Sequence, residues 1–155
     1  MKWIDNPLVS EMMARATDSD RKRTNHNLHA SAEDPVQRYC IAATKDSYFR
    51  PHRHPHNWEL AIVFRGQFEF VVFDENGNVT ESHTVGAQSG KNGFEIEANR
   101  WHCWIPWSDE GVFFEVKSGP YDPATAAEFA PWAPEEGTDE ARQYVQQLKG
   151  MASHG

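Results

Sequence analysis

The sequence predicts an all-β sandwich or barrel with a short helix at each end. Between Ser47 and Lys117, short runs rich in β-branched and aromatic residues alternate with turn signals, at a spacing of roughly 8–12 residues. Asn76 and Gly77 separate two of these runs and are typical of a hairpin turn, because both residue types tolerate positive φ. The chain has 155 residues, which is enough for one domain of the usual size of about 100–200 residues.

The composition excludes several classes of protein. Hydrophobic residues make up 39% of the chain and charged residues 25%, which indicates a packed core rather than disorder. A net charge of -8 argues against nucleic-acid and anionic-membrane partners, which both require basic surface. The first nine residues lack the apolar core of a secretory signal. With Cys40 and Cys103 as its only cysteines, the chain fits a reducing compartment, and we expect a cytoplasmic protein.

Residues 1–20 are expected to form an N-terminal helix. Asn6 can cap it, and Pro7 suits the first helical position. The apolar residues that share one face of this helix are Leu8, Val9, Met12, Met13 and Ala16.

Residues 21–29 form a polar arm at the start of the predicted barrel, which spans residues 21–120. As an extended chain, the arm would place alternate side chains on one face. It is either a solvated arm or a strand that lines a pocket. The side chains in question are Arg21, Arg23, Asn25, Asn27 and His29. Residues 36–44 are compatible with a helix or a strand, and Tyr39 and Ile41 favour the strand.

The remaining strands are predicted from the alternation of apolar runs and turns. They cover residues 60–64, 68–73, 79–85, 94–97, 101–107 and 112–117. Residues 121–155 are a proline-rich tail and a C-terminal helix that pack on the barrel. Phe129 and Trp132 are expected to anchor the tail, and Thr138 to cap the helix.

Four residues have the spacing of a metal site. His52 and His54 lie two positions apart, so an extended chain points both imidazoles to one face. Glu59 leads into an apolar strand, where a buried carboxylate needs a partner. His102 lies in an aromatic strand, with Cys103 facing away from it. Three imidazoles and one carboxylate suit one divalent transition metal, either iron, nickel, zinc or manganese, with two coordination positions left open.

These residues resemble the metal motifs of the cupin superfamily. The first motif is His52-x-His54-x4-Glu59-x6-Gly66, and every position of it is present. The second motif, Pro-x-Gly-x2-His, is recognisable at residues 97–102. It keeps His102 and has Asn99 in place of glycine, and asparagine tolerates positive φ better than other non-glycine residues.

The chain also resembles the WbuC family of cupin-fold metalloproteins. The segments that carry this resemblance are residues 21–27, 35–38, 50–55, 113–123 and 128–135. The resemblance implies a cupin double-stranded β-helix, which is a jelly-roll barrel, with one metal site. Members of that family are associated with O-antigen and other bacterial surface-polysaccharide gene clusters, which implies a small, sugar-derived ligand.

A polar pocket is expected beside the metal. Its candidate residues are Arg23, Asn25, Asn27, His29, Arg50, Trp104 and Lys117. Arginine suits carboxylate or phosphate and asparagine suits hydroxyl groups, so the ligand is expected to be small, polar or anionic. We expect partial convergence of the basic residues on the pocket, with Arg23 and Asn25 within reach of the metal; these basic residues are Arg21, Lys22, Arg23, Arg38, Arg50 and Arg53.

The reaction is open at this stage. An isomerase, epimerase or lyase acting next to a carbonyl is the first hypothesis, with His29 and His56 as candidate bases. An iron-dependent dioxygenase and a non-catalytic metal-binding module are the alternatives, because one fold hosts many functions.

The apolar row Leu60, Ile62 and Phe64 faces away from the metal if Glu59 faces it. That row needs a cover, either the N-terminal arm or a second subunit. Closed two-fold dimers are the commonest oligomers, so we expect a homodimer.

Overall fold

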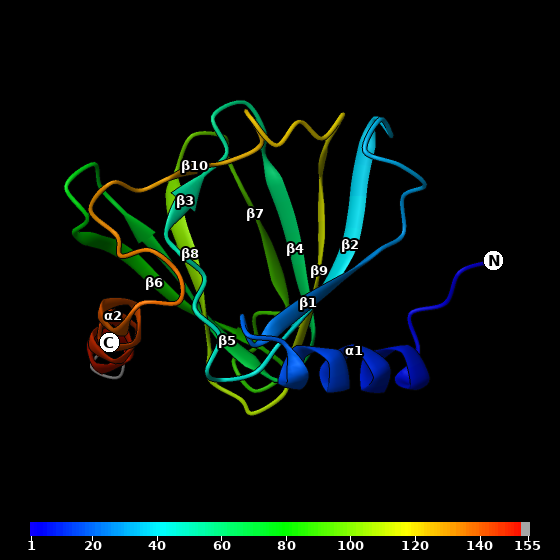
Figure 1. The fold of residues 1–155 in the computed structure, drawn as a ribbon, viewed down its shortest axis with the longest axis horizontal. Helices are drawn as coiled ribbons and strands as arrows, with labels where there is room; N and C mark the ends of the chain where they lie inside the picture. The colour runs from blue at the N-terminus through cyan, green and yellow to red at the C-terminus, as the bar shows by residue number, and fades with distance from the viewer. Residues whose placement is uncertain (153–155) are drawn as a thin grey trace.

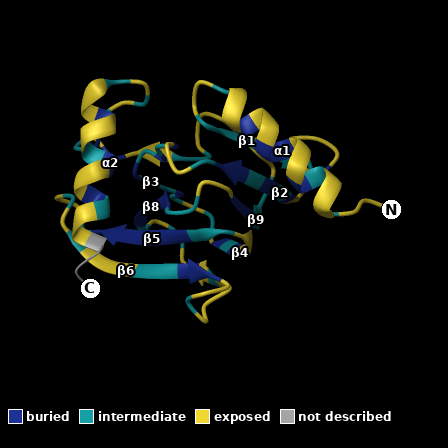
Figure 2. Ribbon diagram, turned by 90° about the horizontal axis from the view of Figure 1, so that it is seen from below, coloured by how far each residue is buried: buried dark blue, intermediate teal, exposed yellow. Residues whose placement is uncertain are grey.

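Two five-stranded antiparallel sheets face each other, and one helix lies outside each of them (Figures 1 and 2). The computed structural model describes residues 1–152. The elements are α1 (Asn6–Asp18), β1 (Arg23–Asn27), β2 (Val36–Ala43), β3 (His52–Arg53), β4 (Glu59–Arg65), β5 (Gln67–Phe73), β6 (Val79–Gly86), β7 (Gly93–Ile96), β8 (Trp101–Pro106), β9 (Gly111–Ser118), β10 (Glu128–Phe129) and α2 (Asp139–Ala152). The first sheet has the order β1-β2-β9-β4-β7 and the second β10-β3-β8-β5-β6. The predicted all-β barrel with terminal helices is therefore confirmed.

Helix α1 covers the outer face of the first sheet. Its predicted apolar face is confirmed, and its buried residues pack on β2 and β9. They are Val9, Met12, Met13 and Ala16, against Cys40, Ala42 and Val112. The predicted cap was wrong by one residue: the carboxylate of Asp5 accepts a hydrogen bond from the Leu8 N–H at 3.1 Å. An aspartate before the first turn competes well with asparagine for this position.

The predicted strand at residues 36–44 is confirmed as β2. It pairs with β1 on one side and with β9 on the other. Its register with β9 places Gln37 opposite Lys117 and Tyr39 opposite Glu115. The same face of β9 carries Phe113, which lies four residues before Lys117 and is fully buried. Four residues of strand span about 13 Å, so one end of the interior is aromatic and the other is polar.

The tail crosses from β9 to the second sheet before α2 begins (Figure 1). Trp132 packs on Phe73, at 5.1 Å between ring centroids, and on Trp101, at 6.2 Å. Phe129 is not the buried anchor that was expected, because 51% of it is exposed. The predicted cap of α2 is confirmed, since the Thr138 hydroxyl accepts from the Ala141 N–H at 3.1 Å. In the described part of the chain, neither helix is long and apolar enough to cross a membrane.

Candidate metal centre

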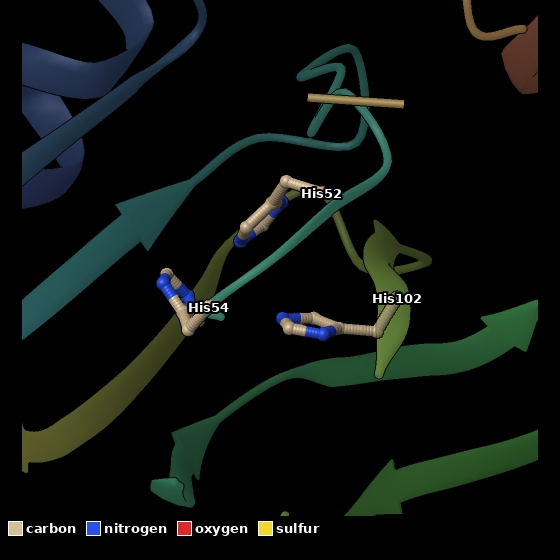
Figure 3. A group of neighbouring side chains, drawn as sticks. All are labelled: His52, His54 and His102. Atoms are coloured by element: carbon tan, nitrogen blue, oxygen red, sulfur yellow. The ribbon is translucent and has the colours of Figure 1, made fainter. Parts of the chain in front are cut away.

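Three imidazoles meet on the inner face of the second sheet. Strands β3 and β8 pair His52 directly opposite His102, and His54 follows two residues after His52. Each ring offers a ligand nitrogen, and these nitrogens all lie within 4.8 Å of one another (Figure 3). The loop before β8 turns at Asn99, with φ 66°, so asparagine does replace the glycine of the motif there.

The backbone fixes the tautomer of each ring. Every Nδ1 of the triad lies beside a carbonyl oxygen, which only accepts, so Nδ1 carries the proton. The distances are 2.9 Å from His52 to Arg50, 2.5 Å from His54 to Ala126 and 2.8 Å from His102 to Arg100. Each Nε2 is then left with a lone pair. The Nε2 of His102 is buried and has no hydrogen-bond partner among residues 1–152.

Burial keeps two of the rings neutral. It lowers the pKa of His102 to about 4. Burial, with the neighbouring imidazoles of His102 and His54, holds the pKa of His52 well below its usual value. Metal ligation requires the neutral ring, so these imidazoles are in the binding form at neutral pH.

Glu59 approaches the triad from the first sheet. It is 1% exposed, and its Oε2 lies 3.0 Å from both His54 Nε2 and Lys117 Nζ. Burial opposes its ionisation, but the charge of Lys117 acts against burial, and the pKa of Glu59 lies well below the usual range. Its Oε1 is buried without a hydrogen-bond partner in the described chain. An ionised carboxylate with a free oxygen, in one buried cluster with the unpaired Nε2 of His102, fits a cation.

Lys117 connects this carboxylate with a second one. The register of β4 and β9 places Glu59 opposite Lys117, and the ammonium also lies 3.5 Å from Glu115 Oε2. Burial lowers the pKa of Lys117, but Glu59 and Glu115 together raise it well above the usual value, so the ammonium stays charged. Burial, followed by the charge of Glu59, raises the pKa of Glu115 to about 7.

A cavity of about 570 Å³ opens beside these groups and shares His54 and Lys117 with them. Four of the predicted pocket residues line it: Asn25, Asn27, His29 and Lys117. The sequence reasoning missed Gln37, Tyr39, Asn57, Ser118 and Tyr121, which also line it. Gln37 and Tyr39 alternate along β2, so the period of that strand was the signal that could have found them.

The other predicted pocket residues, Arg23, Arg50 and Trp104, and the candidate base His56 are not among the described residues that line the cavity. Arg23 lies four residues before Asn27, about 13 Å away along an extended strand. Its guanidinium donates to the carbonyl of Tyr48 at 2.7 Å and pairs with Glu136.

Arg50, Trp104 and His56 lie outside the cavity lining for three different reasons. The Arg50 guanidinium lies 5.3 Å from the ring centroid of Phe129 and donates to a tail carbonyl. Trp104 is 2% exposed and stacks on Phe113 in the aromatic core. His56 follows the turn and is exposed to solvent. His29 is the candidate base that does line the cavity, with Nδ1 2.9 Å from the backbone nitrogen of Arg38.

The expected convergence of basic residues is wrong. Acidic side chains pair with Arg21, Arg23, Arg38 and Arg53 away from the cavity; their partners are Glu136, Asp34, Glu75 and Glu128. These charges are therefore compensated locally and do not add up to an anion-binding surface.

Comparison with solved structures identifies the fold. Oxalate oxidase in complex with the substrate analogue glycolate is 17% identical, with a TM-score of 0.59; the match covers 99% of this chain and 85% of that one. KdgF from Halomonas sp. is 13% identical, with a TM-score of 0.52 and coverage of 66% and 82%. An uncharacterized protein with a double-stranded β-helix domain from Klebsiella pneumoniae is 16% identical, with a TM-score of 0.58 and coverage of 84% and 98%. Likenesses at this identity show the cupin double-stranded β-helix and no more.

No curated protein matches the sequence. The family described as a domain of unknown function, DUF6016, matches residues 4–85, which is more than half of the chain. This segment contains α1, the polar arm, and His52, His54 and Glu59. The protein therefore belongs to the DUF6016 family and has the cupin fold.

Proposed function

We propose that this protein binds one divalent transition metal through His52, His54 and His102, with Glu59 Oε1 as a fourth donor. The observation that carries the proposal is the convergence of three imidazole Nε2 atoms whose Nδ1–H groups are all engaged by backbone carbonyls. Three converging lone pairs beside an ionised carboxylate repel one another unless a cation lies between them.

The donor set narrows the choice of metal. Nitrogen-rich ligation without a thiolate suits iron, nickel, zinc or manganese. Cys103 packs with Val71 and Ile105 on the opposite face of the second sheet, away from the imidazoles. When bound, such an ion supplies Lewis acidity that polarises an oxygen of the ligand. The role of Lys117 is to hold the Glu59 carboxylate in place, through the contact of 3.0 Å between them.

The ligand of this site is, in our proposal, small, polar and sugar-derived. The cavity volume of about 570 Å³ lies in the usual range for small-molecule sites. Amide and hydroxyl side chains on its wall suit a ligand rich in hydroxyl groups: Asn25, Asn27, Gln37, Asn57 and Ser118. The resemblance to the WbuC family supports a place in bacterial surface-polysaccharide metabolism, in the cytoplasm. An isomerase, epimerase or lyase is the reaction class that we propose, with His29 as the candidate base.

The test is elemental analysis of protein purified without an affinity tag. We expect a single transition metal ion per chain in the wild type and a sharp loss of metal in His102→Ala. His83→Ala is the matched control, because His83 is a half-exposed imidazole on β6 that pairs with Glu81 and is not one of the three converging rings. Equal metal content in wild type and His102→Ala would contradict the ligand assignment.

A further inference from the structure

Three acceptors surround the ammonium of Lys117 within 3.5 Å, and the Tyr39 side chain interacts with it as well. Its Nζ lies 3.0 Å from Glu59 Oε2, 3.3 Å from His54 Nε2 and 3.5 Å from Glu115 Oε2. The Nε2 of His54 and the Oε2 of Glu59 are themselves only 3.0 Å apart. Because His54 donates through Nδ1, both of these atoms are acceptors, and Lys117 is the cation that bridges them.

One of these three acceptors is shared with the metal site. The lone pair of His54 Nε2 that accepts from Lys117 is the same lone pair that a metal ion would use. Ligation at His54 therefore removes one acceptor from Lys117. The N–H group that is released belongs to a partly exposed side chain on the cavity wall, so a ligand in the cavity can accept from it.

Metal binding would also make the cavity more positive, which favours an anionic ligand. Lys117 is the one lysine or arginine among the described residues that line it. In the metal-free site its charge is balanced by the ionised Glu59. A bound divalent ion adds two positive charges to this buried cluster, and an anionic ligand would compensate them.

We propose that Lys117 recognises the carboxylate of a small hydroxylated acid, and that it does so only when His54 is engaged by metal. This inference rests on the proposed metal site and deepens it by naming the ligand class. The carboxylate takes the N–H group released from His54, and the amides of Asn25 and Asn27 face the hydroxyl groups. By linkage, metal and acid strengthen the binding of each other.

Isothermal titration calorimetry with D-glucuronate and D-glucose tests this, since glucuronate carries a carboxylate where glucose carries a hydroxymethyl group. Elemental analysis first establishes that the metal is bound. We expect the metal-loaded wild type to bind glucuronate at least about tenfold more tightly than the metal-free protein does, and more tightly than glucose. In Lys117→Gln with full metal content, the preference for glucuronate over glucose should disappear. Asn27→Ala is the matched control and should weaken both probes alike.

Lys117→Gln leaves the buried Glu59 and Glu115 without an ammonium, which can prevent folding. In that event the double variant Glu115→Gln, Lys117→Gln takes its place, with Glu115→Gln as its reference. An unchanged preference for glucuronate without Lys117 overturns the proposal. Equal binding of both probes, or no binding of either to the metal-loaded protein, overturns it too and leaves the metal site standing. A wild type that retains no metal overturns the proposed function itself.

Discussion

Backbone carbonyls, rather than acidic side chains, orient the three imidazoles. Two of these carbonyls belong to residues two positions before the histidine, Arg50 for His52 and Arg100 for His102. The third belongs to Ala126, 72 residues after His54. The tautomer of two ligands is therefore a local property of the strand, and that of His54 depends on the tail.

The depressed pKa of His102 predicts how the stability of the metal-free protein depends on pH. Its pKa is about 4 in the folded chain, against 6.5 for the unperturbed group. Between these values the unfolded chain binds a proton that the folded chain does not, so stability falls as the pH drops through this window. From pH 7 to pH 5 the loss from His102 alone should be about 2 kcal/mol.

Urea unfolding of chelator-treated protein at pH 7 and pH 5 measures this. The wild type should lose about 2 kcal/mol more than His102→Gln does over this interval. His83→Gln changes a half-exposed imidazole outside the triad and should behave as the wild type does. Parallel losses in wild type and His102→Gln would show that this imidazole is already protonated in the folded protein at pH 5.

At the scale of the element, the tail is part of the site. It supplies the Ala126 carbonyl and a wall of the cavity, and it is held to the second sheet by Trp132 between Phe73 and Trp101. Ala130 and Ala133 are buried in the same cluster. A segment without a core of its own is thus fixed by one aromatic side chain and two small ones.

We predict that Trp132→Ala lowers the free energy of unfolding by about 3 kcal/mol, at the low end of the range for aromatic-to-alanine changes because the ring is only partly buried. The melting temperature should then fall by roughly 5–10 °C, which differential scanning calorimetry measures. Phe129→Ala is the matched control and should have little effect, because half of that ring is exposed. Equal shifts for both variants would mean that the tail is anchored elsewhere.

The hairpin turn between β5 and β6 packs against the ring of Trp132. Gly77 has φ +84°, and a Cβ there would lie 2.8 Å from the ring of Trp132. Gly90 has φ +74°, and a Cβ there would have nothing within 4 Å. Gly90→Ala should therefore cost about 1 kcal/mol from the backbone alone, and Gly77→Ala at least about 2 kcal/mol because of the clash with the ring. Chemical denaturation of both variants checks the difference, and equal costs would show that the ring moves aside.

At the scale of the whole molecule, the two sheets are covered unequally. Helix α1 covers the part of the first sheet formed by β1 and β2, and α2 with the tail covers the second sheet (Figure 2). On β4, Leu60 is half-buried, while Ile62 is 37% and Phe64 49% exposed. The Phe64 ring stacks on that of Phe114, so the apolar surface continues onto β9.

We expect a second copy of the chain to cover this face in a homodimer, since symmetric pairing of one apolar face is the commonest mode of assembly. Light scattering at micromolar concentration should give twice the chain mass for the wild type and the chain mass for Phe64→Glu. Tyr121→Ser removes an exposed aromatic side chain at the cavity and should stay dimeric. A monomeric wild type would contradict the expectation.

The sequence by itself predicted most of the strands, both helices and the positions of the three histidines. The strands follow from a period of two and from turn residues, which act over a few positions. The pair His52 and His54 follows from the same period, because two residues on one strand face share a direction. The apolar face of α1 was predicted for the equivalent reason in a helix.

The tertiary structure alone decided what surrounds those histidines. Strand register places Lys117 opposite Glu59 and Gln37, and the path of the tail brings Ala126 to His54. The polar arm was predicted as one row, but the barrel divides it. Its first two side chains, Arg21 and Arg23, pair with Glu136, whereas Asn25 and Asn27 reach the cavity. Alternation determines the face of a strand that a side chain takes, whereas its partner across the sheet depends on register between segments far apart in the chain.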